Sequence, residues 1–132
     1  MPVDLNSVLF DVETRLGEFH ASLGNADKAS YYALQSNKRK VAMEVFFWDE
    51  TDASWKDYNT NTGTRTDGFY ASTIFPVWAG AHDKSPQDLS RVVAGISEHV
   101  SFLLKSSIVW NVCLNHLALL VCISVRSSDL RV

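Results

Sequence analysis

The chain has 132 residues, the length of one domain, and can bury roughly two-thirds of the surface that its unfolded form exposes. Hydrophobic residues make up 46% of it and charged residues 20%, as in ordinary globular proteins, and the net charge is −3. This acidic balance gives no electrostatic basis for binding nucleic acid. The first residues have neither a basic start nor an apolar run, so no signal peptide is expected there.

Two long helices are predicted at the start of the chain. Over residues 4–23, apolar side chains recur at steps of three and four, with Asp4 as the expected N-cap and Gly24 ending the helix. A second helix is predicted over 26–47, with Asn25 as its N-cap. Its apolar positions are widely spread around the helix, which indicates contact with more than one neighbour.

The helical period breaks over residues 48–68, where turn-forming residues surround a short extended piece at 55–58. A third helix is predicted over 71–79. It should be kinked or start late, because Pro76 would cost about 3 kcal/mol in a helix interior. The Ser-Pro-Gln-Asp sequence at 85–88 opens a fourth helix, with proline at its first position and an acid in its first turn. Helices joined by turns, without a run of strands, predict an all-α fold.

Three sequence motifs occur in the first 80 residues. They are Pro-Val-Asp-Leu-Asn at 2–6, Trp-Asp-Glu-Thr-Asp-Ala-Ser-Trp-Lys-Asp-Tyr at 48–58, and Phe-Tyr-Ala-Ser-Thr-Ile-Phe-Pro-Val-Trp-Ala-Gly at 69–80. Each resembles a segment of the trehalases, the glycoside hydrolases that split α,α-trehalose into two glucoses. The motifs stand in the same order and at the separations expected of that family. The sequence is most similar to animal-type enzymes of this family, and the resemblance covers residues 2–100.

The resemblance also implies a fold and a domain organisation. Trehalases fold as an (α/α)6 barrel of inner and outer helix pairs, so about four helices would form about a third of the barrel. Residues 1–100 are therefore expected to be a partial trehalase-like (α/α)6 barrel segment, all-α in class. Residues 101–132 are expected to be an apolar tail, to which the resemblance assigns no fold.

The tail contains 18 residues without a charge, at 108–125, which is close to the minimum for a membrane span. Asn111, Asn115 and His116 oppose insertion into a bilayer. Three interpretations stay open: translated non-coding sequence, a buried strand or helix, and a membrane segment. The length of this stretch would permit contact with a membrane, but its polar residues do not favour it.

Inverting glycoside hydrolysis needs a protonated and an ionised carboxyl group about 6.5 to 9.5 Å apart. The resemblance implies an Asp as the acid, in a Glu-Ser-Gly-Trp-Asp stretch before the first motif, and a Glu as the base beyond a later signature. Both fall outside this sequence, so no catalytic residue is assigned in it. The chain alone is therefore predicted to be inactive. It is also predicted to be poorly soluble, because an opened barrel exposes apolar inner faces.

Four acids in the second motif are the local alternative for acid–base chemistry. Asp49, Glu50 and Asp52 form a turn, and Asp57 follows within nine positions. We expect the turn acids to be solvated, with pKa values near the ordinary ones, so that none holds a proton at neutral pH.

The resemblance suggests three candidate substrate-binding residues, Asn6, Asp57 and Tyr58. Asp57 and Tyr58 match the family's Asp–Tyr pair after a tryptophan, which would order a loop near the barrel mouth by a structural hydrogen bond or contact the sugar. Asn6 falls in the first turn of a helix, where it can face the active centre. The four histidines are too widely spaced to suggest a metal site, and no cofactor is expected.

The sequence thus predicts a fragment of an α,α-trehalase, with trehalose as the substrate of the complete enzyme. The resemblance suggests that such an enzyme is secreted or attached to a membrane. The alternative is a non-catalytic, trehalase-derived helical module that binds a partner, or a membrane through its tail. A module should be a stable monomer or dimer that melts cooperatively, whereas a fragment should aggregate or lack a cooperative melt.

Overall fold

The computed structural model describes residues 1–106, and this part of the chain is all-α in class, as the sequence predicts. The helices are α1 (Val3–Ser22), α2 (Ala26–Phe46), the 3₁₀ helix η1 (Ala71–Ile74), α3 (Phe75–Ala79) and α4 (Pro86–Ser106). The strands, of two residues each, are β1 (Trp48–Asp49), β2 (Ser54–Trp55), β3 (Tyr58–Asn59) and β4 (Thr64–Arg65). Residues 1–95 form one compact unit, and a second unit begins at Ile96 within α4.

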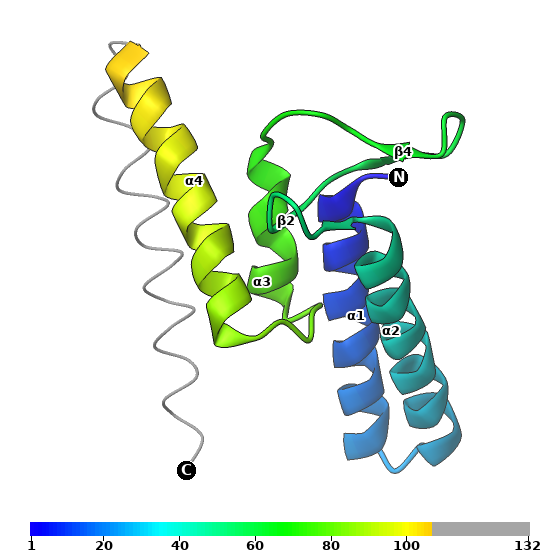
Figure 1. The fold of residues 1–132 in the computed structure, drawn as a ribbon. Helices are drawn as coiled ribbons and strands as arrows, with labels where there is room; N and C mark the ends of the chain where they lie inside the picture. Colours follow the sequence, from blue (N-terminus) through cyan, green and yellow to red (C-terminus); the bar gives the residue numbers. More distant parts are fainter. Residues whose placement is uncertain (107–132) are drawn as a thin grey trace. The chain divides into compact units, whose positions relative to one another are not determined.

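Helices α1 and α2 form an antiparallel hairpin, in which they lie side by side along their lengths (Figure 1). Gly24 in the connecting turn has a φ of 71°, a left-handed conformation that favours glycine. The Asn25 side chain accepts a hydrogen bond from the Lys28 backbone N–H at 3.3 Å, which confirms the predicted N-cap. Gly17 is buried where α1 approaches the backbone of α2. This helical hairpin is the unit expected of a helical-barrel segment.

The start of α1 differs from the prediction. The helix begins at Val3, with Pro2 at the N-cap position, and Asp4 lies in the first turn. There the Asp4 carboxylate accepts a hydrogen bond from the Leu5 backbone N–H at 2.7 Å. Asp4 is therefore not the N-cap of α1.

Two small antiparallel strand pairs fill the segment where the helical period breaks. Trp48 pairs with Trp55 in the first, and Tyr58 pairs with Arg65 in the second. The two tryptophan rings pack at a centroid distance of 4.6 Å and are both buried. The first strand pair therefore places Trp48 and Trp55 in the core near the C-terminal end of α2, where Phe47 is also buried.

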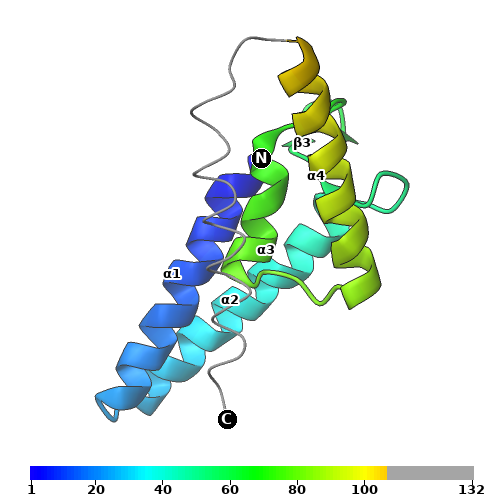
Figure 2. The same ribbon diagram turned by 90° about the vertical axis from the view of Figure 1, so that its left-hand side faces the viewer.

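The third helix starts late, as predicted. Residues 71–74 form a 3₁₀ turn, so Pro76 falls in the first turn of α3, where proline is tolerated. Figure 2 shows α3 alongside the N-terminal half of α1. At the start of α4, Ser85 Oγ accepts a hydrogen bond from the Asp88 backbone N–H at 3.2 Å and donates one to the Asp88 carboxylate at 2.8 Å. This capping arrangement confirms the predicted start of the fourth helix.

The apolar stripe predicted for the first helix is only partly covered within residues 1–106. Leu9 and Leu16 are half-buried, whereas Val12 and Phe19 are exposed by 43% and 63%. No helix in the described part of the chain combines the length and apolar character needed to cross a membrane. The predictions for the 108–125 segment concern residues outside the described part.

Candidate functional site

The structure brings the three candidate substrate-binding residues to one place, around the segment that leads into α1. The Tyr58 backbone N–H donates to the Met1 carbonyl oxygen at 3.0 Å, and the Met1 ammonium group donates to the Tyr58 carbonyl oxygen at 2.6 Å. Asn6 Nδ2 donates to the Pro2 carbonyl oxygen at 2.7 Å. Asp57 reaches the same segment through its carboxylate, so residues 57–58 and 1–6 form one polar cluster.

Asp57 supplies the cap that Asp4 does not. Its Oδ1 accepts a hydrogen bond from the backbone N–H of buried Val3 at 2.8 Å. This N–H belongs to the first turn of α1 and has no acceptor within the helix. The positive end of the helix dipole also stabilises a carboxylate at this place. Asp57 itself is held by its carbonyl oxygen, which accepts from the Thr66 backbone N–H at 2.8 Å. Asp57 thus makes a structural hydrogen bond, and its contact with a sugar stays a prediction.

Asn6 and Tyr58 are held by their neighbours as well. Asn6 Oδ1 accepts from Arg39 Nη1 at 3.0 Å, and Arg39 binds the Glu13 carboxylate with two further nitrogens, at 2.9 and 2.7 Å. The hydrogen bond to Glu13 raises the pKa of Arg39 above its ordinary value. The Tyr58 ring packs edge-on against Phe46 at a centroid distance of 5.2 Å. These contacts tie the cluster to α2 and fix the orientation of both side chains.

Two of the turn acids are paired with Lys56, which directly follows β2. Lys56 Nζ donates to Asp49 Oδ2 at 2.9 Å and also pairs with Asp52. The hydrogen bond from Lys56 lowers the pKa of Asp49, and the Thr51 backbone N–H adds to this effect. The expectation of an ordinary pKa for Asp49 is therefore wrong, because the turn folds back on Lys56.

Glu50 is likewise held in its ionised form. Trp48 Nε1 donates to Glu50 Oε2 at 2.8 Å, and Arg91 from α4 donates to Glu50 Oε1 at 3.2 Å. These two hydrogen bonds lower the pKa of Glu50, in that order, so the expectation of an ordinary pKa is wrong here too. An ionised carboxylate can accept a proton but has none to donate. The lowered pKa values of Asp49 and Glu50 are opposite to the raised pKa that a general acid needs at neutral pH.

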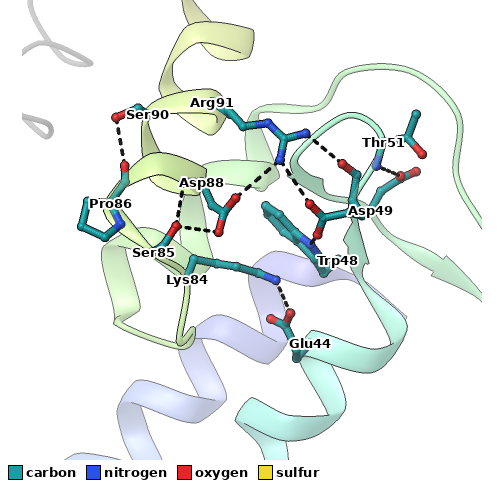
Figure 3. A network of polar contacts seen from close by, with 11 residues as sticks. Glu44, Trp48, Asp49, Thr51, Lys84, Ser85, Pro86, Asp88, Ser90 and Arg91 are labelled. Atoms are coloured by element: carbon teal, nitrogen blue, oxygen red, sulfur yellow. Dashed lines mark hydrogen bonds and ion pairs between the residues drawn. The ribbon is translucent and has the colours of Figure 1, made fainter.

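A second polar cluster, centred on Lys84 and Glu44 outside the predicted site, lies between α2 and the start of α4 (Figure 3). Lys84 pairs with Glu44 of α2, and its ammonium group lies 3.8 Å from the centroid of the Trp48 ring. Lys84 and Glu44 are 40 positions apart, and neither belongs to a sequence motif. No local pattern could have indicated this contact. Within residues 1–106, no three His, Cys, Asp or Glu side chains gather as a metal site.

Comparison with known proteins gives one consistent family. The sequence profile described as Trehalase matches residues 1–110. The chain is 41% identical to the trehalase of Dictyostelium discoideum over 88 residues, which are 67% of this chain and 15% of the relative. Human trehalase is 35% identical over 80 residues, 61% of this chain and 14% of the relative. Apis mellifera trehalase is 30% identical over 105 residues, which are 80% of this chain and 15% of the relative. The chain spans about 15% of the length of these relatives.

Proposed function

Because the chain belongs to the trehalase family, we propose that it is a segment of a glycoside hydrolase that hydrolyses α,α-trehalose to two glucose molecules. The observation that carries this proposal is the family match over residues 1–110, most of the chain. In the complete enzyme, one carboxyl group would protonate the departing glycosidic oxygen. A second would activate water on the opposite face of the sugar, with inversion at the anomeric carbon.

The 132 residues by themselves are proposed to be inactive. The resemblance assigns the acid and the base to positions outside them. The acids of the described turn are poorly suited to replace the general acid, because Lys56 and Arg91 bind Asp49 and Glu50 in their ionised forms. The role of this segment would be to form barrel wall and to hold the polar cluster around residues 1–6 in a fixed position.

Substrate contact by Asn6, Asp57 and Tyr58 belongs to this proposal. The convergence of the Asn6 and Asp57 side chains around the start of α1 supports it, since one bound sugar could meet both at once. Their structural hydrogen bonds are compatible with this role, because groups held in place by neighbours are suited to orient a substrate hydroxyl. Trehalose would be the ligand, and no cofactor is invoked.

The activity can be tested with two proteins. One is the 132-residue chain; the other is Dictyostelium trehalase in which residues 1–95 replace the matching segment. Glucose release from α,α-trehalose by the chimera, and none by the chain alone, supports the proposal. Glucose release by the purified chain would overturn its assigned inactivity. A chimera that melts cooperatively but does not hydrolyse trehalose would favour the non-catalytic helical module instead.

A further inference from the structure

The connection between α3 and α4 is fastened to α2 by two ion pairs. Lys40 Nζ of α2 lies 2.7 Å from Asp83 Oδ1, and Lys84 pairs with Glu44 of α2. The two pairs have opposite polarity, so each side of the contact contributes one cation and one anion. His82 directly precedes Asp83 and Lys84 in the sequence and belongs to neither pair.

His82 holds the same connection through a neutral nitrogen. Its Nδ1 accepts a hydrogen bond from the Lys84 backbone N–H at 3.3 Å. A histidine nitrogen can accept only when it carries no proton, so this contact requires the neutral imidazole. The ring is half-buried and lies 5.8 Å from the ring of buried Trp55 of β2. The imidazole therefore packs against an apolar surface, the Trp55 ring, on the side that faces β2.

The charged groups that face His82 do not provide an unused partner for an imidazolium. They are Lys40 and Glu44 from α2, and Asp83 and Lys84 from the connection itself. Each carboxylate is already engaged by a lysine, and β2 contributes the uncharged Trp55. Burial lowers the pKa of His82 below its ordinary value, and the two carboxylates offset this only in part.

We propose that His82 is an acid-sensitive latch, whose neutral imidazole fixes the turn that presents Asp83 and Lys84 to α2 and whose protonation opens that turn. Protonation removes the acceptor for the Lys84 N–H and places a positive charge on a half-buried ring, where burial disfavours it. The start of α4 follows the connection directly, so its contacts with the β1–β2 turn, made by Arg91 with Glu50, would loosen with it.

The sign of the pH dependence follows from the lowered pKa. The unfolded chain takes up a proton near the ordinary histidine pKa of about 6.5, whereas the folded chain does so only at lower pH. The contribution of His82 to stability is therefore complete above about pH 6.5 and is lost as the pH falls through the folded value. Between the two values, the opening equilibrium of the connection should rise about tenfold for each pH unit.

Hydrogen exchange of the Lys84 amide in the 132-residue chain tests this proposal. Its protection factor, corrected for intrinsic exchange and referred to amides of the α1–α2 hairpin, is measured from pH 7.5 to 5.0. We expect the protection factor of the wild type to fall about tenfold for each pH unit below about 6.5, until the folded pKa is reached. It should also fall in His20→Phe, a control at another half-buried histidine, stacked on Tyr32. In His82→Phe, which keeps an aromatic ring but cannot take up a proton, the factor should not vary with pH.

A pH-independent protection factor in the wild type would overturn the latch, as would an unchanged loss in His82→Phe. Should His82→Phe not fold, the ¹⁵N shifts of His82 in the wild type decide. An unprotonated Nδ1 at pH 7, with a titration that coincides with the shift of the Lys84 amide, supports the latch. A protonated Nδ1 at pH 7 refutes it. Both readouts are independent of trehalose hydrolysis.

Discussion

Asp57 caps helix α1 from a distant part of the sequence: its Oδ1 accepts the Val3 backbone N–H at 2.8 Å, although the residues are 54 positions apart. A cap contributed by a neighbouring residue would stabilise the helix alone. This one joins the helix to the connection between β2 and β3 as well, and so couples the start of the hairpin to the turn-rich segment. The bond therefore serves as both a helix cap and a tertiary contact.

We predict that Asp57→Ala lowers the free energy of unfolding by about 1 kcal/mol, the usual cost of losing a helix cap. Asp57→Asn retains an oxygen acceptor and should lose less. Denaturant unfolding of the Dictyostelium chimera measures both, with Asp67→Ala, at an exposed loop acid, as the control.

The same substitution in the Dictyostelium chimera separates the two roles of Asp57. A purely structural role predicts lower stability with an unchanged KM for trehalose. A raised KM without a loss of stability would instead favour contact with the sugar.

Gly17→Ala should be tolerated and should stabilise the hairpin by about 0.5–1 kcal/mol, because alanine is the better helix former. A methyl group at this position would lie 3.5 Å from the Ala29 carbonyl oxygen, which is ordinary contact. Gly17→Leu should destabilise by about 1–3 kcal/mol, because the larger side chain meets the backbone of α2. Thermal unfolding followed by circular dichroism distinguishes them. Glu18→Leu, at the exposed next position, is the matched control, and an equal loss there would contradict the explanation.

Arg39→Met should cost about 2 kcal/mol, since it leaves the Glu13 carboxylate and Asn6 Oδ1 without their donor. Arg39→Lys keeps the charge but cannot reproduce the two-pronged contact, so it should recover only part of the loss. Arg15→Lys provides the control, because Arg15 is mostly exposed and solvent screens its pair with Asp11, so a smaller effect is expected there than at position 39. Equal effects at positions 39 and 15, measured by denaturant unfolding, would show that the interhelical contact adds nothing.

Asp49→Asn and Glu50→Gln should leave kcat and the pH–rate profile of the chimera unchanged, because neither side chain is assigned a chemical step. Loss of one limb of the profile in either variant would contradict this assignment.

Asp49 should nevertheless affect stability in acid. Because Lys56 lowers its folded pKa, its contribution is present above the ordinary Asp value of about 3.9. This contribution is lost as the pH falls through the folded value. The stability of the wild type should therefore fall more steeply than that of Asp49→Asn over that range, as urea midpoints measured at successive pH values would reveal.

The sequence by itself determined the family, the all-α class and most helix boundaries. These features depend on local signals, which act between residues a few positions apart. The periodic apolar residues define α1 and α2, Asn25 and Ser85 begin helices with their own side chains, and Pro76 delays the start of α3. The three motifs likewise identify the family without any knowledge of the fold.

Only the tertiary structure decided how the polar residues are used. It gave the cap of α1 to Asp57 rather than Asp4, lowered the pKa values of Asp49 and Glu50, and packed His82 against Trp55. The key partners of Asp57, Glu50 and Lys84 lie 40 to 54 positions away in the sequence. Such pairings have no local signature, because a charged side chain can take any partner that folding brings within hydrogen-bonding distance.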